Sequence, residues 1–350
     1  MKPVASKFLS IARPIFAIAL ISFALAEVSL RIYTYFRSSI LFYNESWNQR
    51  FRGRPFAQVG KSKLNSLGFK DKEFTPKPQN GYRIVALGDS FAFGVVPYEN
   101  NYLTLTEELL QKHHPQVDLL NMGILGTAPI DYWQLLRDEG LSFKPDMVLV
   151  SFFFGNDFVG AHRRRLFEYS YLASLVYRGS RIVLAYRGPW AGEGVLKYCD
   201  DCPSSNETRY LDVEGRRSYI YIKSNQRATR SVGAAFAYLE KINDLCKERG
   251  IKLIVVLIPD ELQINQDLQR SVRQSSHPRL NPSDWDITLP NRSMAARLSS
   301  SGIDYIDLYE PFLAMGSKKP LYIPRNTHWN IAGNQLAANV IASHIEKLLK

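Results

Sequence analysis

The sequence predicts a three-layer α/β sandwich, in which helices cover both faces of a five-stranded parallel sheet. From residue 82 onward, short apolar segments alternate with longer segments of helical periodicity. The segment 147–154 is apolar except for Ser151, as expected of a strand that is covered on both faces. Polar turns follow several of these segments, and an open parallel sheet carries its functional site at that edge.

The alternation can be resolved into individual elements. We expect strands at residues 82–87, 117–121, 147–154, 251–258 and 305–308. We expect helices at residues 101–113, 129–139, 229–249, 291–300 and 331–349, and Gly250 marks the end of the third. This order of elements is that of a parallel sheet with crossover helices.

Two regions do not follow the alternation. Residues 158–224 are aromatic, basic and irregular, which indicates an inserted cap or lid region rather than a separate domain. Residues 37–79 mix aromatic and basic side chains and contain Pro76 and Pro78, which is typical of a linker. The folded domain is therefore expected at residues 80–350.

The composition is that of an ordinary globular protein with a basic surface. Hydrophobic residues make up 45% of the 350 residues and aromatic residues 12%, which argues against disorder. The net charge of +11 suits an anionic lipid or polysaccharide surface. No nucleic-acid recognition motif is present, so we expect no nucleic-acid partner.

Residues 1–36 have the pattern of a targeting segment. Three basic residues come first, and residues 14–26 are then apolar apart from Ser22. A cleavable signal peptide would fit, because Ala24-Leu25-Ala26 is a small-x-small cleavage pattern. The aromatic and basic residues that follow favour an uncleaved, single-pass membrane anchor. Either interpretation places the rest of the chain outside the cytoplasm, secreted or periplasmic if cleavage occurs near Ala26.

The cysteines predict neither a metal site nor a cofactor. Cys199 and Cys202 form a single CxxC, which lacks the second pair that a structural zinc site needs. They form either a local disulfide or two free thiols. Cys246 lies on the apolar side of a predicted helix and is expected in the core.

Four polar turns are predicted to meet at one edge of the sheet. In chain order they are Gly88-Asp89-Ser90, residues 121–126, Gly155-Asn156-Asp157 and the turn containing His328. A serine hydroxyl becomes a useful nucleophile when a base removes its proton, and histidine is the natural base near neutral pH. The set therefore points to acyl transfer, with Ser90 as the nucleophile and His328 as its base.

The remaining turn residues suit the stabilisation of an oxyanion. The N–H groups of Ser90 and Gly126 and the side-chain amide of Asn156 are candidate donors. Gly88 allows a tight turn, and Asp89 is expected to hold the loop through side-chain-to-backbone bonds. Taken singly, Ser90 could be a helix N-cap and His328 a structural histidine. All four turns in this order are improbable by chance.

These motifs resemble those of the SGNH/GDSL hydrolase superfamily. The matching blocks lie at residues 83–94, 121–126, 155–157 and 328–330, and the resemblance extends over about residues 65–350. The resemblance implies a flavodoxin-like sheet. It also implies that Ser90, Gly126, Asn156 and His328 are the serine, glycine, asparagine and histidine after which the SGNH family is named. The chain looks most similar to membrane-anchored bacterial members that modify envelope or exported polysaccharides.

The chain departs from the family pattern at one point. The family usually has an aspartate three residues before the histidine, or two before it in some acetyltransferase branches. Arg325 and Asn326 occupy those positions here. The histidine could be oriented by Asn326, as in papain-like proteases, by a backbone carbonyl, or by Asp307 at the end of the preceding strand. Loss of the acid would lower turnover.

The sequence therefore predicts a serine esterase or acylhydrolase. Its substrate would be an acylated carbohydrate or lipid of the cell envelope or of an exported polymer. An O-acyltransferase that uses the same residues is the first alternative. A catalytically weak carbohydrate-binding or assembly protein that keeps the fold is the second. We expect Asp157 to support the site together with Gly88 and Asp89, and no metal to take part.

Overall fold

The computed structural model describes residues 3–36, 55–56, 58–59, 62–160, 170–173, 175–176 and 198–349. The chain divides into two compact units. Residues 1–50 and 163–194 form one unit, and residues 51–162 and 195–350 form the other. The larger unit contains the sheet and all of the candidate site residues.

The larger unit is built around a five-stranded sheet in the order β4-β3-β5-β6-β7. All neighbouring strands are parallel. This confirms the predicted fold class, and each strand lies within one residue of its expected place. The strands are β3 (Tyr82–Leu87), β4 (Val117–Asn121), β5 (Met147–Phe153), β6 (Lys252–Ile258) and β7 (Asp304–Asp307).

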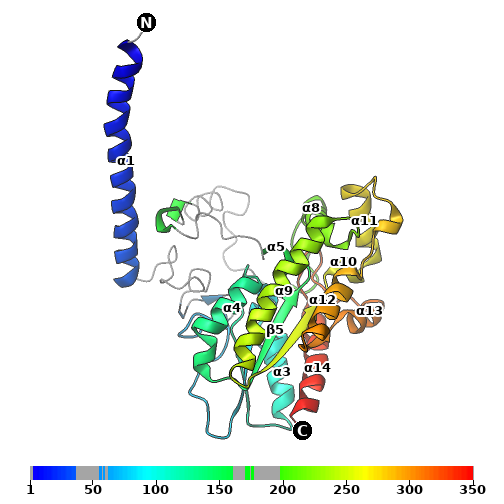
Figure 1. Ribbon diagram of the computed structural model, residues 1–350. Coiled ribbons are helices and arrows are strands. Elements are labelled where there is room, and N and C mark those ends of the chain that lie inside the picture. Colours follow the sequence, from blue (N-terminus) through cyan, green and yellow to red (C-terminus); the bar gives the residue numbers. More distant parts are fainter. Residues whose placement is uncertain are drawn as a thin grey trace. The chain divides into compact units, whose positions relative to one another are not determined.

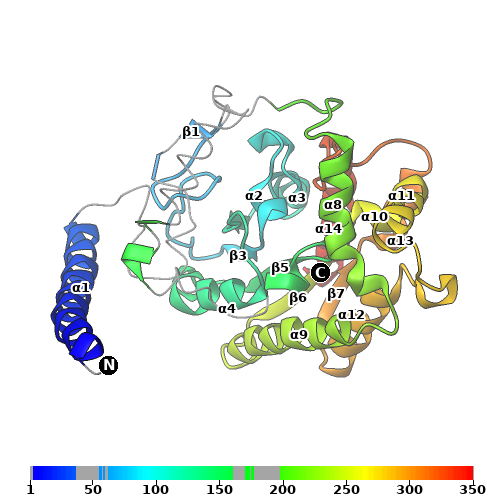
Figure 2. The same ribbon diagram turned by 90° about the horizontal axis from the view of Figure 1, so that it is seen from above.

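Two layers of helices cover the sheet (Figures 1 and 2). On one face lie α4 (Pro129–Asp138), α9 (Gln226–Lys247) and α12 (Leu289–Ser300). On the other lie α3 (Tyr102–Gln111), α13 (Tyr309–Gly316) and α14 (Ile331–Leu348).

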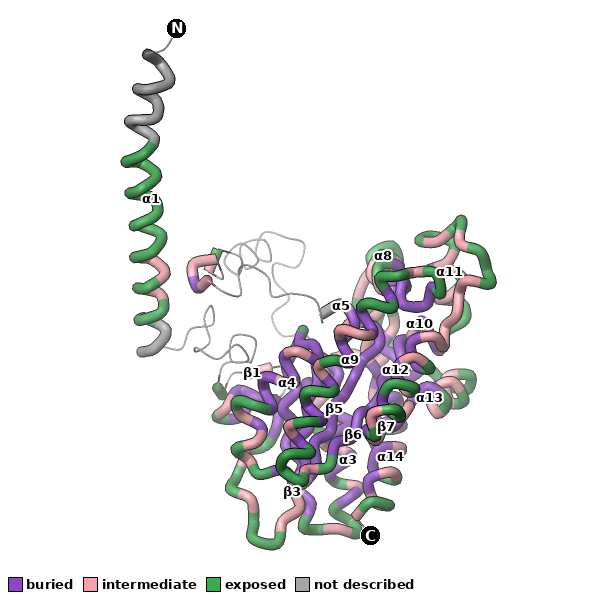
Figure 3. The backbone as a smooth tube through the Cα atoms, viewed as in Figure 1, coloured by how far each residue is buried: buried purple, intermediate pink, exposed green. Residues whose placement is uncertain are grey.

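The two hydrophobic cores follow from the two-residue period of the strands. In β5, Val148 and Val150 pack into the core beneath α9, whereas Met147 and Leu149 pack into the core beneath α14. Burial on both faces explains why this strand is apolar almost throughout. Figure 3 shows the strands as the most completely buried part of the unit.

Several short elements were not expected from the sequence. Helices α8 and α11 are strongly polar and bury few apolar side chains, so they lack the apolar content by which the other helices were recognised. The unexpected elements are β1 (Gln58–Val59), β2 (Ser62–Lys63), α2 (Ser90–Phe93), α5 (Asp157–Gly160), α8 (Glu207–Arg217), α10 (Glu261–Ile264), α11 (Gln266–Ser276) and α13, with 3-10 turns η2 (Tyr98–Asn100), η3 (Gly140–Phe143), η4 (Ser218–Tyr221) and η5 (Pro282–Asp284).

The expected cap at residues 158–224 is described only in part. Residues 161–169 and 177–197 lie outside the described chain. At the other end of the region, Tyr219, Ile220 and Tyr221 are buried in the core that contains α9. This end of the region therefore packs into the core of the domain.

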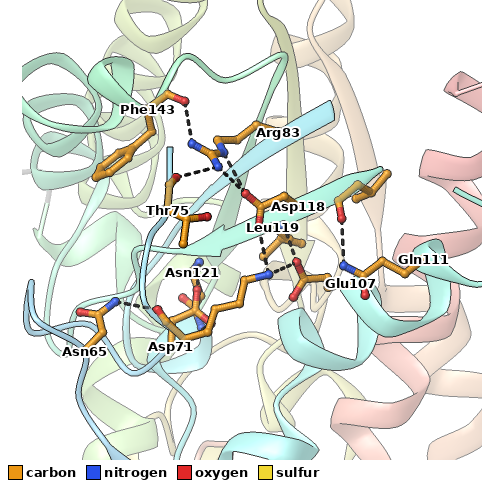
Figure 4. Close-up of polar contacts among 12 residues, drawn as sticks. Asn65, Asp71, Thr75, Arg83, Glu107, Gln111, Asp118, Leu119, Asn121 and Phe143 are labelled. Atoms are coloured by element: carbon orange, nitrogen blue, oxygen red, sulfur yellow. Dashed lines mark hydrogen bonds and ion pairs between the residues drawn. The ribbon is translucent and has the colours of Figure 1, made fainter. Parts of the chain in front are cut away.

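The expected linker at residues 37–79 also ends earlier than predicted, because its last part packs on the sheet. Phe69 is fully buried in the core. Asp71 accepts the N–H of Asn121 at 2.7 Å, and Glu107 accepts that of Leu119 at 2.8 Å (Figure 4). Both N–H groups belong to the edge strand β4, whose outer side would otherwise be open to another chain.

Buried charges hold this segment in place. Arg83, which is 1% exposed, donates two hydrogen bonds to Asp118, at 2.9 and 2.6 Å, and one to the carbonyl of Thr75 at 2.9 Å (Figure 4). Lys72 forms ion pairs with Asp118 at 2.9 Å and with Glu107. The sequence between residues 65 and 75 is thus fixed to β3 and β4, at the base of the loop that carries Gly126.

The smaller unit contains α1 (Pro3–Phe36), one long apolar helix. Its segment Arg13–Tyr33 has a mean hydropathy of 2.0, which is long and apolar enough to cross a membrane. Glu27 is the one carboxylate of this segment. It pairs with Arg31 at 2.8 Å and accepts the hydroxyl of Ser170 at 2.8 Å and the N–H groups of Tyr171 and Leu172 at 2.9 and 3.0 Å.

Candidate active site

Ser90 lies at the first position of α2, directly after β3. Asp89 caps this short helix, and its carboxylate accepts the N–H of Phe91 at 2.9 Å. Gly88 lies where no other residue fits, because a Cβ there would be 2.8 Å from that of Ala92 and 2.9 Å from that of Ser151. The tight turn is therefore imposed by close packing between β3, β5 and α2, and it presents Ser90 at the carboxyl edge of the sheet.

His328 contacts both Ser90 and Asn326. Its Nε2 is 2.7 Å from the Ser90 hydroxyl, and its Nδ1 is 2.6 Å from Oδ1 of Asn326. The same Oδ1 accepts the backbone N–H of His328 at 3.1 Å, which identifies this atom as the amide oxygen. The proton on the ring then resides on Nδ1, and Nε2 is free to accept the proton of Ser90.

Asp307 does not take part in this relay. Its carboxylate accepts the amide of Asn291 at 3.1 and 3.2 Å and the N–H of Tyr309 at 2.9 Å, at the start of α13. Arg325 has a left-handed backbone, with φ at 51°, and its side chain pairs with Glu207 at 3.5 Å. Of the three candidates for orienting His328, Asn326 is the one in hydrogen-bonding contact with its ring.

An aromatic cluster surrounds the histidine. The ring of Phe91 lies 5.1 Å from that of His328 and 4.9 Å from that of Trp329, centroid to centroid. Trp329 is 1% exposed and also packs against Phe312 and Tyr102. Burial in this cluster lowers the pKa of His328 to about 4, and the positive charge of Arg217 acts in the same direction.

Arg217 is a site residue that the sequence analysis missed. It is the last residue of α8, and it donates to the hydroxyl of Thr327 at 3.1 Å and to Glu214 at 3.4 Å. Burial raises the pKa of Glu214 well above its usual value, with the charge of Asp260 as the next cause. The positive charge of Arg217 acts on His328, because it is among the causes that lower the pKa of this histidine.

Asn156 and Ser90 are linked through Asp89. The amide of Asn156 donates to Asp89 Oδ2 at 2.7 Å, and the Ser90 hydroxyl lies 3.5 Å from the same oxygen. Burial raises the pKa of Asp89 to about 6. An amide nitrogen carries two hydrogens, so Asn156 keeps one N–H for a further acceptor. The first and third motif turns thus meet at Asp89.

Gly126 belongs to a loop that is bonded to the first motif. Gly88 accepts the N–H of Ile124 at 3.0 Å and the hydroxyl of Thr127 at 3.3 Å. Gly126 has φ at 71°, and no atom lies within 4 Å of the position that a Cβ would occupy. Within the described part of the chain, its N–H forms no hydrogen bond with another residue. The backbone is therefore available to an acceptor from outside the chain.

Asp157 has a supporting place beneath the site. It is fully buried, and its two oxygens accept the hydroxyl of Tyr132 and the N–H of Phe153, both at 2.9 Å. Burial raises its pKa well above its usual value. The hydrogen bonds of Asp157 close the turn after β5, and this turn carries Asn156. Across residues 13–33, 62–158 and 198–349, no three His, Cys, Asp or Glu side chains are grouped to hold a metal ion.

The C-terminal part of the chain, residues 213–350, matches the family ALGX, described as the SGNH hydrolase-like domain of the acetyltransferase AlgX. This part of the chain is thus similar to an SGNH hydrolase-like domain. The match confirms the resemblance to the SGNH/GDSL superfamily that the motifs indicated. The matched residues include His328 and Asn326, whereas Ser90, Gly126 and Asn156 precede them.

Other similarities are more distant. The alginate biosynthesis protein AlgX of Pseudomonas putida is 23% identical over 167 residues, which cover 43% of this chain and 34% of that protein. The chain thus matches about a third of the length of this relative. An acetyl xylan esterase, AlAXEase, is 18% identical, covering 75% of this chain and 100% of that one, with a TM-score of 0.43. A lipase/acylhydrolase from Enterococcus faecalis is 15% identical, covering 76% and 96%, with a TM-score of 0.41.

We expect the ring of His328 to stay neutral far below the usual pH of histidine titration. Its ring ¹⁵N signals in NMR spectra of the selectively labelled protein should titrate near pH 4, because burial and Arg217 disfavour the imidazolium. Arg217→Gln removes the repelling charge and should raise this pKa. Arg216→Gln, in which the replaced side chain is 70% exposed, is the matched control and should not change it.

The same shift has a consequence for stability. The unfolded chain takes up the proton near pH 6.5, whereas the folded chain does so near pH 4. This histidine therefore reduces the free energy of unfolding as the pH falls from about 6.5 to 4. A His328 titration near pH 6.5 in the folded protein would contradict the described environment.

Proposed function

We propose that this protein is a serine acyl-transfer enzyme that acts on ester-linked acyl groups of a carbohydrate outside the cytoplasm. The observation that carries the proposal is the continuous relay Ser90–His328–Asn326, with contacts of 2.7 and 2.6 Å. No other described serine has a histidine nitrogen at its hydroxyl together with the family motif around it. Ser218, which contacts His277 at 2.7 Å, is buried and follows no strand of the sheet.

The chemistry follows from the relay. The Ser90 hydroxyl gives its proton to Nε2 of His328 as its oxygen attacks the ester carbonyl. The resulting oxyanion accepts hydrogen bonds from the N–H groups of Ser90 and Gly126 and from the free amide N–H of Asn156. His328 then returns the proton to the departing sugar oxygen, and the acyl group remains on Ser90.

Water or a second hydroxyl completes the reaction. In hydrolysis, His328 takes a proton from the water that attacks the acyl-enzyme, and it returns this proton to the Ser90 oxygen as the acid is released. In transfer, a sugar hydroxyl takes the place of water and a new ester forms. The match of residues 213–350 to the acetyltransferase AlgX favours transfer of an acetyl group, and the name of the relative in Pseudomonas putida suggests a polysaccharide acceptor.

A second candidate function is that of a catalytically weak carbohydrate-binding or assembly protein. It is favoured by the neutral partner of His328, because an amide cannot stabilise the imidazolium as a carboxylate does. The positive charge of Arg217 opposes the imidazolium further. Under this alternative, the fold and the site geometry would serve recognition rather than turnover.

We further propose that α1 is an uncleaved membrane anchor. The helix runs without a break from Pro3 to Phe36, across the possible cleavage site at Ala26. Glu27, the carboxylate within the apolar segment, is compensated by Arg31 and by three donors from residues 170–172. A charge that is neutralised in this way costs less in an apolar surrounding than an isolated one.

Replacement of the relay residues should abolish turnover but not folding. Ser90→Ala and His328→Ala are each expected to lower kcat on p-nitrophenyl acetate by about 10⁴-fold or more, because each removes a group that acts in the transition state. A fluorophosphonate should label Ser90 in the unsubstituted protein alone. The controls Ser142→Ala and His113→Ala change exposed residues and should retain activity. Equal losses of Tm and activity in His328→Ala would instead indicate a structural histidine.

An acid in place of the amide should raise activity. Asn326→Asp preserves the shape of the side chain and places a negative charge 2.6 Å from Nδ1 of His328, so we expect kcat to increase about tenfold. Arg325→Asp should not help, because this side chain is directed at Glu207. Asp307→Asn should leave kcat nearly unchanged. Loss of activity in Asp307→Asn, without a gain in Asn326→Asp, would contradict the proposed role of Asn326.

Reporter fusions can test on which side of the membrane the domain lies. Reporter enzymes joined after residue 60 should be active only outside the cytoplasm, because the basic residues precede the apolar segment. Mass spectrometry of the purified protein should find the segment Arg13–Tyr33 still attached. A mature chain that starts at Glu27 would show that the segment is a signal peptide.

A further inference from the structure

A small disulfide-closed turn lies against the loop that carries His328. Cys199 and Cys202 are bonded to each other, so this CxxC forms a disulfide rather than two free thiols. The turn and the residues after it, 198–207, touch the histidine loop, residues 322–331, at several points. Nothing in the sequence indicated that these two segments meet.

The turn holds the histidine loop on both sides of His328. On the preceding side, the N–H of Ser204 donates to the carbonyl of Pro324 at 3.0 Å, and the hydroxyl of Ser205 donates to that of Arg325 at 3.0 Å. On the following side, the carboxylate of Asp200 accepts the N–H of Ile331 at 2.9 Å. Asp200 lies between the two cysteines, and Ser204 and Ser205 follow shortly after the second, so the disulfide constrains the turn from which these contacts come.

One further contact reaches the relay itself. The amide nitrogen of Asn326 donates to the hydroxyl of Ser204 at 3.0 Å. The opposite end of the same amide, Oδ1, accepts the Nδ1–H of His328 at 2.6 Å. Ser204 is thus the fourth member of a continuous series of hydrogen bonds that begins at the Ser90 hydroxyl.

An amide needs this contact more than a carboxylate would. The two oxygens of a carboxylate are equivalent, whereas rotation of an amide by 180° exchanges an acceptor for a donor. If Asn326 turned its NH₂ group to His328, Nδ1 would have to accept and the ring proton would move to Nε2. That tautomer cannot take the proton of Ser90, so the orientation of this amide controls the base.

We propose that Ser204, held by the Cys199–Cys202 turn, is a positioning residue that acts together with the backbone N–H of His328, which donates to Oδ1 at 3.1 Å, to fix Asn326 and hence the reactive tautomer of His328. The inference rests on the acyl-transfer function proposed above. Ser204 accepts the amide N–H and leaves Oδ1 for the histidine. It does not touch the reacting atoms, and it acts only through Asn326.

The disulfide contributes to this positioning of Asn326 by Ser204. Reduction adds two electrons and two protons and converts the disulfide to two thiols, with the added reductant as the electron donor. The turn then loses the bond that constrains it. Reduction should therefore produce the same defect as loss of the Ser204 hydroxyl.

The test is a double-mutant cycle on the full chain. Ser204→Ala should lower kcat on p-nitrophenyl acetate about tenfold with KM unchanged, the effect of one functional hydrogen bond. Ser204→Thr keeps a hydroxyl and should recover most of the activity. In the Asn326→Asp background, Ser204→Ala should change kcat less than about threefold, since a carboxylate has no wrong orientation. Equal losses in both backgrounds would show a purely structural role and overturn the inference.

Matched controls separate this effect from general damage. Ser205→Ala removes a hydrogen bond to the same loop, at the same 3.0 Å, without touching Asn326, and should change kcat less than about threefold. A reducing phosphine should lower kcat of the unsubstituted protein as far as Ser204→Ala does, and should not lower that of a Cys199→Ser, Cys202→Ser variant further. If kcat were unchanged after verified reduction, the disulfide would have no part in positioning Asn326.

The tautomer can be observed directly, without any substrate. The ring ¹⁵N shifts of His328 should report Nδ1–H alone in the unsubstituted protein and a mixture of tautomers in Ser204→Ala. A single Nδ1–H tautomer in both would overturn the inference even if the protein turned over no ester. If Ser90→Ala retained full activity, the proposed function would fail, whereas full activity of Ser204→Ala beside an inactive Ser90→Ala would remove only the role of Ser204.

Discussion

The hydrogen bond between the ring of His328 and the side chain of Asn326 is the interaction on which the site depends. It determines which ring nitrogen carries the proton, and therefore whether the nitrogen at Ser90 can act as a base. In related chemistry, a carboxylate does this and also stabilises the charge that develops on the ring. An amide does only the first. The ring of His328 is thus held in the required orientation, but no negative charge stabilises its protonated form. The positive charge of Arg217 disfavours that form further.

The carboxylate of Asp89 connects several parts of the site. Asp89 is buried, yet it accepts hydrogen bonds from Phe91 and Asn156, which lower the cost of its burial. One carboxylate thereby caps α2, orients the amide of Asn156 and lies 3.5 Å from the Ser90 hydroxyl. Ser90 and the candidate oxyanion donor Asn156 share this anchor. A shift of one would therefore be accompanied by a shift of the other, which keeps their separation constant.

The sequence was sufficient for the parts of the site that lie next to strands. An apolar strand with a polar turn after it is a local pattern, and parallel strands bring their carboxyl ends together, so Ser90, Gly126 and Asn156 could be placed without coordinates. Arg217 and Ser204 could not. Arg217 contacts Thr327 across 110 positions of sequence, and it comes from a polar helix with few apolar residues. The choice between Asn326 and Asp307 depended on which side chain contacts the ring of His328, and residue spacing alone does not show that contact.

The disulfide turn has a consequence for the order in which the domain is assembled. Its two cysteines are separated by only two residues, so the bond can close within the local chain, before any strand pairing with distant residues. In a chain that leaves the cytoplasm from its N-terminal side, this turn emerges long before β7 and α14. The histidine loop is then among the last segments to arrive, and it meets a surface that is already rigid. In such a chain, the histidine loop would dock on a turn that its disulfide had already closed.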